Sequence, residues 1–306
     1  MELDLLRLFA DVARRRSFAA VARERDIDAS AISRGMAALE ADLGVRLLQR
    51  TTRSMNLTEA GEIYLSRILP LIEDLDQARD EVAASRNEPV GSVRVTASLT
   101  FGQVCLAPQL PAFRTAFPRL HLELILSDEN LDLFAERIDI ALRLGPSYRA
   151  DVIGVKLFPT RYLVVASPDY LLRHSAPSTP RELTNRNCLL FSLPDFRSRW
   201  RFRRDGQIEE VPVSGDILIS NALTLRSAAI QGLGPALLAD WTVSEDIQSG
   251  RLVELFADWD VAATSFDTAA WLLYPSRARL PFKVRSTIDF LRRSLGRSGS
   301  LDGQDA

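Results

Sequence analysis

Apolar residues recur at helical spacing in two stretches at the start of the chain, which are Leu3, Leu6, Phe9 and Ala10, then Phe18, Val21 and Ala22. The second stretch follows Ser17, and serine is a preferred helix N-cap because its hydroxyl accepts a hydrogen bond from a free amide of the first turn. Residues 28–41 repeat the helical spacing, with Ile32, Met36 and Leu39 on one face. The pattern therefore predicts three short helices within about 40 residues, the compact geometry of a helix-turn-helix.

A basic segment without acidic residues follows the third predicted helix. Residues 43–58 carry Arg46, Arg50 and Arg53. We interpret this segment as a hairpin with a positive tip at residues 51–54, which suits contact with phosphates and with the narrow minor groove of DNA. The alternative is a solvated hairpin in which Arg46 forms an ion pair with a neighbouring helix.

Three strings in this region carry a resemblance to a known family, namely AISR at 31–34, ALEADLGVRLLQRTTR at 38–53 and LTEAG at 57–61. They resemble the DNA-binding segment of LysR-type transcriptional regulators, over residues 2–61 and in weaker form to about residue 295. The resemblance implies a winged helix-turn-helix in residues 1–60 whose third helix enters the major groove. The DNA-binding residues that it implies are Ala29, Ser30, Ser33, Arg34, Arg50, Thr51, Thr52 and Arg53.

The third helix departs from the family pattern at several positions that the resemblance turns toward DNA. Asp28 can cap the helix, although it places a negative charge near phosphate. Gly35 lacks a side chain that could read a base edge, and Ala38 stands where a basic residue is frequent. Base recognition therefore depends on two serine hydroxyls and on Arg34, whose shape matches guanine. The alternative for Arg34 is a solvated surface arginine.

Composition limits the electrostatic argument. The chain has 306 residues, enough for two or three domains, but its formal net charge is only -2. Residues 1–60 contain ten arginines and nine acidic residues, a balance of +1. DNA affinity must therefore come from a local patch of positive charge. Because one such domain would bind weakly, we expect a homodimer or homotetramer in which the domains bind DNA together.

Residues 61–88 are expected to form a long linker helix. Apolar residues fall at an a/d spacing along it, which are Leu65, Ile68, Ile72, Leu75 and Val82. The family uses this helix to dimerise, so the resemblance implies pairing with a second copy. The alternative is that the stripe packs back on its own domain. Pro70 interrupts the regular bonding of such a helix.

Beyond Pro89 the pattern changes to alternating strands and helices. Strands are expected at 93–98, 120–126, 138–145, 161–167, 211–215, 216–220, 236–238 and 269–275, with helices through 107–113, 131–136 and 223–231. We interpret this as an α/β domain with largely parallel strands. The resemblance implies a two-lobed, periplasmic-binding-protein-like effector domain over 89–296, with one lobe at about 90–162 and 271–295 and the other at about 163–268. Residues 297–306 lack periodicity and are expected to be disordered.

Ligands of such sheets lie beyond the carboxyl ends of the strands, where helix N-termini offer free amides. The effector-binding residues expected there, which coincide with contact regions of the family, are Ser98, Leu99, Thr100, Phe101, Leu144, Gly145, Ser220, Asn221, Thr224 and Pro235. The alternatives are capping roles for Ser98 and Asn221 and core packing for Phe101. Hydroxyls and amides favour a small organic acid, and the nearby Arg143 either adds charge or pairs with an aspartate, Asp128 or Asp139.

The sequence lacks the signature motifs of several other classes of protein. The sequence has no GxSxG, P-loop or GxGxxG motif, and Cys105 and Cys188 stand far apart in apolar surroundings, so we expect no catalytic residue, metal or cofactor. No signal peptide or membrane-spanning run is apparent, which favours a cytoplasmic protein. The sequence indicates a LysR-type regulator that binds double-stranded DNA and a small effector, with RNA polymerase as a further candidate partner. The alternative is a two-lobed solute-binding protein with no role in gene regulation.

Overall fold

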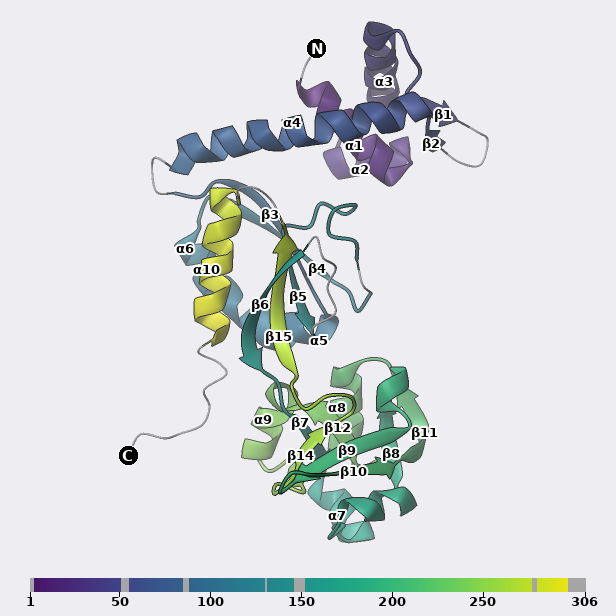
Figure 1. Cartoon of the computed structure of the whole chain (residues 1–306), viewed down its shortest axis with the longest axis vertical. Helices are drawn as coiled ribbons and strands as arrows, with labels where there is room; N and C mark the ends of the chain where they lie inside the picture. Colours follow the sequence, from purple (N-terminus) through teal and green to yellow (C-terminus); the bar gives the residue numbers. More distant parts are fainter. Residues whose placement is uncertain are drawn as a thin grey trace.

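The computed structural model describes residues 3–50, 55–84, 88–129, 131–145, 152–276 and 280–296. Figure 1 shows three parts stacked along the longest axis, with the N-terminal winged helix at one end and two α/β lobes below it. A long helix crosses the molecule above the first lobe. The predicted architecture is therefore confirmed.

The winged helix consists of α1 (Leu3–Arg15), α2 (Phe18–Arg25), α3 (Ala29–Leu43) and the hairpin strands β1 (Leu48–Arg50) and β2 (Met55–Leu57). Phe9, Val21 and Ile32 meet in its core, each fully buried. The Ser17 hydroxyl accepts from the amide of Ala20 at 3.2 Å, so the predicted cap is confirmed. Asp28 occupies the N-cap position of α3, but its side chain makes no capping bond there.

Helix α4 (Glu59–Ala84) begins at a tight contact with the hairpin. The Thr58 hydroxyl accepts from the amide of Gly61 at 3.0 Å and donates to the carbonyl of Arg46 at 2.7 Å. A Cβ on Gly61 would come within 2.2 Å of the Leu47 carbonyl oxygen, so only glycine allows this approach. The threonine and glycine of the LTEAG string thus join α4 to the wing.

The apolar residues of α4 lie in two different environments, one buried and one exposed to solvent. Ile68 and Ile72, two of the predicted seam positions, are buried in the core of the winged helix, and Leu65 packs against the same core. The prediction that they form a dimer seam is wrong, because the short helices α1 and α3 need α4 to close their core. A second apolar group on α4 faces solvent, at Ile63, Leu71 and Leu75. The side chain of Val82 lies outside the described residues.

The first lobe, lobe I, is a five-stranded sheet in the order β4-β3-β5-β15-β6. Its strands are β3 (Gly91–Ala97), β4 (Leu120–Leu126), β5 (Ile140–Leu144), β6 (Val152–Pro159) and β15 (Ala269–Pro275). Helical residues 99–116, which include α5 (Leu99–Phe101) and α6 (Leu110–Ala116), and helix α10 (Phe282–Gly296) supply its helical layer. Val95, Leu272 and Phe290 are buried between sheet and helices.

The second lobe, lobe II, has a sheet in the order β10-β9-β14-β7-β12-β8-β11, with β13 also paired to β7. Its strands are β7 (Tyr162–Ala166), β8 (Asn187–Phe191), β9 (Arg199–Arg204), β10 (Gln207–Pro212), β11 (Ser214–Ile219), β12 (Ala236–Ala239), β13 (Val253–Leu255) and β14 (Asp260–Ala262). Its α-helices are α7 (Pro168–His174), α8 (Ala222–Ile230) and α9 (Asp240–Gln248). Separate apolar clusters around Trp200 and Leu225 form its core.

Two predictions about the lobes are wrong. The sheets are mixed rather than largely parallel: β3 is parallel to β4 and β5, but β15 runs antiparallel to β5 and β6. The reason is that β6 leads into lobe II and β15 returns from it. Residues 131–136 form turns in place of the predicted helix, with the Asp132 carboxylate bonded to the amides of Phe134 and Ala135.

Two chain crossings connect the lobes and are bonded to each other. The first runs from β6 to β7 through Thr160, and the second from β14 to β15 through Thr268. The amide of Thr160 donates to the carbonyl of Thr268 at 2.9 Å, and the Thr268 hydroxyl donates to the Thr160 carbonyl at 2.6 Å. The crossings therefore form one paired connection, near the positions 162 and 270 that the sequence indicates.

A buried charge holds two helices of lobe II together. The carboxylate of Asp246 in α9 is fully buried and accepts hydrogen bonds from Arg226 in α8 and, at 2.8 Å, from Nε of Arg251. Burial alone would raise the pKa of Asp246, but the two arginines lower it overall. Since the folded pKa lies below the ordinary value, these pairs stabilise the lobe above that value and lose their effect as the pH falls.

We expect Asp246→Ala to lower the free energy of unfolding by about 1 to 3 kcal/mol, because it removes the hydrogen bonds that join Asp246 to Arg226 and Arg251. Urea denaturation followed by tryptophan fluorescence measures the change. The exposed neighbour Glu245 supplies the control, since Glu245→Ala should stay within about 0.5 kcal/mol of wild type. Equal stability of the two variants would show that the buried pairs contribute little.

Candidate DNA interface and effector loops

The outer face of α3 carries the predicted base-reading residues. Ala29, Ser30 and Arg34 are exposed and Ser33 is half-buried, while Ile32 and the rest of the apolar face point into the core. Figure 1 shows α3 at the end of the molecule away from the two lobes. Described residues of the lobes therefore do not cover the helix that would enter a major groove.

Gly35 does not belong to this outer face. A Cβ at Gly35 would lie 2.9 Å from Cδ2 of Leu8 and 3.3 Å from Cδ2 of Leu5, so the glycine packs against α1. The interpretation of Gly35 as a DNA-facing position is wrong. Its absent side chain allows α1 and α3 to approach closely, and Ala38 is the exposed small residue on the DNA side.

The wing is positioned by a carboxylate that sequence reasoning missed. Oε1 of Glu40 in α3 accepts from the amides of Leu47 and Leu48 at 2.8 and 3.0 Å. Strand β1 then pairs antiparallel with β2, with Arg50 opposite Met55. The predicted contacts Thr51, Thr52 and Arg53 lie outside the described residues, as does the side chain of Arg50. No local motif marks Glu40, because its partners are seven and eight residues away.

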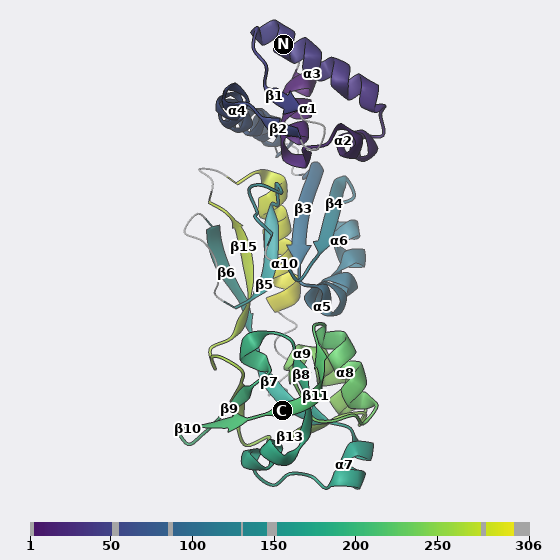
Figure 2. The same cartoon turned by 90° about the vertical axis from the view of Figure 1, so that its right-hand side faces the viewer.

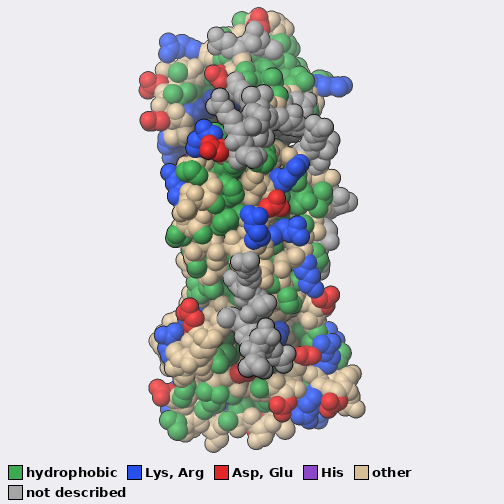
Figure 3. All heavy atoms as spheres, turned by 90° about the vertical axis from the view of Figure 1, so that its left-hand side faces the viewer, with side chains coloured by type: hydrophobic (Ala, Val, Ile, Leu, Met, Phe, Trp, Pro, Cys, Tyr) green, Lys and Arg blue, Asp and Glu red, His purple; other side chains and the backbone are tan. Residues whose placement is uncertain are grey.

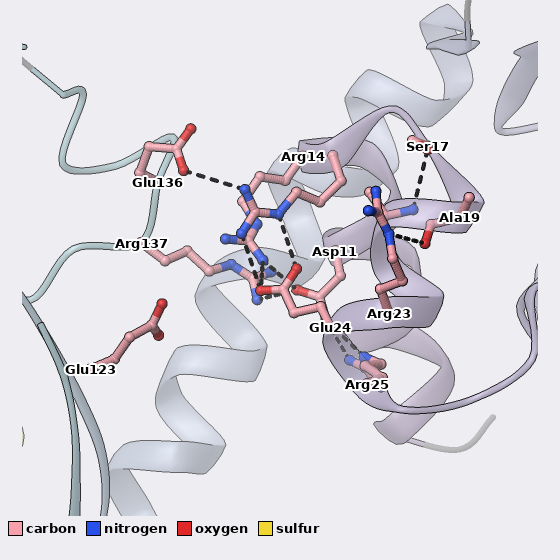
Figure 4. Close-up of polar contacts among 12 residues, drawn as sticks. Asp11, Arg14, Ser17, Ala19, Arg23, Glu24, Arg25, Glu123, Glu136 and Arg137 are labelled. Atoms are coloured by element: carbon pink, nitrogen blue, oxygen red, sulfur yellow. Dashed lines mark hydrogen bonds and ion pairs between the residues drawn. The ribbon is translucent and has the colours of Figure 1, made fainter. Parts of the chain in front are cut away.

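Many charges of the winged helix neutralise one another (Figure 4). Asp11 accepts from Nε of Arg25 at 3.0 Å, and Glu24 accepts from Nε of Arg15 at 2.9 Å and from Nη2 of Arg14 at 3.1 Å. The hydrogen bond from Arg15 is the main cause that lowers the pKa of Glu24 to about 2. Arg14, Arg15 and Arg25 are therefore engaged in ion pairs within the protein.

Acidic and basic side chains occur together on the face drawn in Figure 3. That mixture agrees with the formal net charge of -2. A local rather than a global positive field is thus available to attract DNA.

The lobe I residues predicted to contact effector follow the carboxyl end of β3. The Ser98 hydroxyl accepts from the amide of Phe101 at 3.4 Å, so it caps the helical segment. Thr100 is buried, and Leu99 is partly exposed with its amide donating to Oδ1 of Asp128 at 3.0 Å. Phe101 is 1% exposed and stacks on Phe158, which makes it a core residue and not part of a cavity wall.

The lobe II residues occupy comparable loops. Oδ1 of Asn221 caps α8 by accepting from the amides of Leu223 and Thr224 at 3.1 and 3.0 Å. Ser220 and Thr224 are exposed, whereas Pro235 is buried. In lobe I, Leu144 is exposed and Gly145 adopts a φ of 95°. Figures 1 and 2 show α5 and α8, the helices beside these loops, on the ends of the lobes that face each other.

Arg143 is the cation near this junction. Its Nη2 donates to the Thr96 hydroxyl at 3.2 Å and to the Glu129 carbonyl at 3.4 Å. Burial lowers the pKa of Arg143, and Asp128 opposes that shift. Asp139, one of the two aspartates considered as its partner, accepts instead from the amide of Arg94 at 2.9 Å.

The surroundings of both thiols disfavour the thiolate form. Burial raises the pKa of Cys105 and of Cys188 to about 12, so each is protonated at neutral pH. The described part of the chain holds no group of three His, Cys, Asp or Glu placed to bind a metal. Among the helices that the structure describes, none is both long and apolar enough to span a membrane.

Comparison with protein families identifies both parts of the chain. Residues 3–62 match the family of bacterial regulatory helix-turn-helix proteins of the lysR type, and residues 86–296 match the LysR substrate binding domain. The second match alone covers more than half of the chain.

Full-length relatives have the same organisation. The chain is 34% identical to the HTH-type transcriptional regulator DmlR of Escherichia coli K12 over 292 residues, covering 95% of this chain and 94% of that protein. The structure of this chain is similar to that of CrgA, a LysR-type transcriptional regulator of Neisseria meningitidis, with a TM-score of 0.62 and 32% identity. The similarity covers 97% of this chain and 99% of CrgA. The structure is also similar to that of AphB, the Vibrio cholerae virulence activator, with a TM-score of 0.61, 30% identity and coverage of 96% and 100%. The chain belongs to the LysR family of transcriptional regulators, and it is neither an enzyme nor a plain solute-binding protein.

Proposed function

We propose that this regulator reads DNA with the outer face of α3 and the wing, pairs through α4, and responds to a small organic acid held between the lobes. In this division, residues 1–60 bind DNA, residues 61–88 form the linker and dimerisation helix, and residues 89–296 bind effector. The proposal is supported by the exposed α3 face with Arg34 at its centre, on a winged helix in which Arg14, Arg15 and Arg25 are engaged in ion pairs.

DNA recognition then divides between two kinds of contact. Arg34, with Ser30 and Ser33 on the same face, supplies direct contacts to base edges in the major groove. Arg50, Thr51, Thr52 and Arg53 of the wing contact phosphates and the minor groove, which position the helix without reading sequence. A protein that acts on the chromosome in this way is expected in the cytoplasm, with RNA polymerase as a further partner.

The effector loops support a ligand with hydrogen-bonding groups. The candidate residues are Ser98, Leu99, Thr100, Leu144, Gly145, Ser220, Asn221, Thr224 and Pro235, with Phe101 behind them in the core. A carboxylate is favoured because Arg143 is the nearby cation and the helical segment after Ser98 presents its N-terminal end. A ligand that binds one arrangement of the lobes more tightly shifts the population toward it, and the DNA-binding domains follow.

Arg34→Ala is expected to weaken binding to the preferred site by about 1 to 3 kcal/mol and to relax the base preference at one position. Arg53→Ala should instead weaken binding to all sequences by a similar factor and lower the salt slope by about 1. Selection from a random duplex pool, followed by titrations at several salt concentrations, separates these outcomes. Equal losses on selected and random DNA for both variants would contradict the division of contacts.

The exposed stripe of α4 is expected to form the dimer seam. Leu71→Glu together with Leu75→Glu should yield monomers, because pairing would bury unpaired charges at a cost of several kcal/mol. Sedimentation velocity measures the association state, and circular dichroism should show the helices retained.

Ile72 provides the contrasting control, because it is buried in the core of the winged helix. Ile72→Glu should unfold that domain, whereas the double variant should separate folded subunits. An unchanged sedimentation coefficient for the double variant would place the dimer contact elsewhere.

A thermal-shift screen of small organic acids is expected to find a stabilising compound. At a concentration of about 100 times its Kd, the ligand should add about 2.7 kcal/mol to the stability of the folded state. Thr100→Val should abolish the shift, while Thr115→Val on α6 of the same lobe should retain it. Stabilisation only by uncharged or cationic compounds, with Thr100→Val behaving as wild type, would rule out an organic acid at this site.

A further inference from the structure

Charged side chains join the winged helix to lobe I of the same chain (Figure 4). Arg137 lies in the segment 131–139 between β4 and β5, and its Nη1 donates to Oδ1 of Asp11 in α1 at 3.0 Å. Beside it, Oε2 of Glu136 lies 4.0 Å from Nη1 of Arg15. Each part contributes one cation and one anion, so the two surfaces are complementary in charge.

The acceptor on the winged helix is held in place by its own domain. The side chain of Asp11 is 14% exposed, and Nε and Nη2 of Arg25 hold its Oδ2 at 3.0 and 2.5 Å. Its other oxygen, Oδ1, is the one that receives Arg137. The carboxylate is therefore oriented toward lobe I by bonds that do not involve lobe I.

The donor side is held equally firmly by the sheet of lobe I. Nη1 of Arg94 in β3 donates to the Glu136 carbonyl at 2.6 Å, and its Nη2 donates to Glu123 in β4 at 3.0 Å. Ile138, next to Arg137, is fully buried. Segment 131–139 is thus held against the lobe I sheet at Glu136 and at Ile138, the residues on either side of Arg137.

Arg137 itself adopts a backbone conformation that arginine disfavours. Its φ is 50°, in the left-handed region where a Cβ crowds the backbone. Such residues persist where the surrounding structure holds them, and they gather at functional positions. Here the strained residue is the one whose side chain crosses to the winged helix.

The contact lies well away from the covalent joint. Helix α4 ends at Ala84 and β3 begins at Gly91, and α10 contacts α4 near this joint. Figure 1 shows the end of α4 at one side of the top of lobe I, with α2 and the turns of segment 131–139 toward the other side. The winged helix is therefore attached to lobe I at two separate places, the chain connection from α4 to β3 and the Arg137–Asp11 contact. The second attachment prevents a rotation about the first.

We propose that segment 131–139 is a clasp that holds the winged helix at a fixed angle on the effector domain of its own chain, through Arg137–Asp11 and Glu136–Arg15. The clasp leaves the DNA-facing side of α3 uncovered, so it sets orientation and does not block binding. Its release lets α4 and the winged helix swing together about the joint. The consequence, a change in the spacing of paired half-sites, rests on the proposed function.

Small-angle X-ray scattering of the full chain tests the clasp without DNA or effector, so failure of either proposed activity leaves the result unaffected. Arg137→Gly removes the guanidinium and relieves the backbone, and Arg137→Glu reverses the charge. Asp205→Gly, at a φ of 52° in the β9–β10 turn, is the matched backbone control. Arg181→Glu, which breaks an exposed pair with Glu209 in lobe II, is the matched charge control.

Both Arg137 variants should change the maximum dimension at about 0.1 M salt, while both controls match wild type. The 26 residues of α4 span about 39 Å, so a swing of about 20° moves the far end by about 13 Å. Arg137 variants that superimpose on wild type, or controls that change equally, would overturn the proposal.

Discussion

Burial of Ile68 and Ile72 makes α4 part of the winged helix, and the placement of the remaining parts follows from this contact. The short helices cannot close a core alone, so the linker and the DNA-binding domain form one body. Other apolar residues of α4, namely Ile63, Leu71 and Leu75, remain exposed to solvent. Because the helix is fixed in the domain, any partner on these residues is held in a defined relation to α3.

Several charged side chains of the winged helix form ion pairs with one another. Asp11 and Glu24 engage Arg14, Arg15 and Arg25, which orders α1 against α2 and removes these cations from the surface field. Partly buried pairs of this kind are less screened by salt than exposed ones. The winged helix therefore has a nearly balanced charge, with Arg34 exposed on the outer face of α3.

The connection between β4 and β5 reaches both ends of lobe I. At its start, Asp128 accepts from the amide of Leu99 beside the effector loops. At its end, Arg137 donates to Asp11 of the winged helix. Both contacts belong to the connection between two parallel strands, β4 and β5, which must return from the carboxyl ends of the strands to their amino ends. The topology thus brings the candidate effector loops and the winged helix onto the same stretch of chain.

Local sequence signals determined the helices of the winged helix, the cap at Ser17 and most strands, because each depends on neighbours within a few residues. The exposed α3 face followed from the same periodicity. Only the tertiary structure decided that Ile68 and Ile72 face inward, that Gly35 packs on Leu8, that the sheets are mixed, and that Phe101 belongs to the core. It also decided the pairing of Arg137 with Asp11, which are 126 residues apart. Periodicity shows which face of a helix is apolar, but the partner of that face, and of any charge, is set by long-range packing.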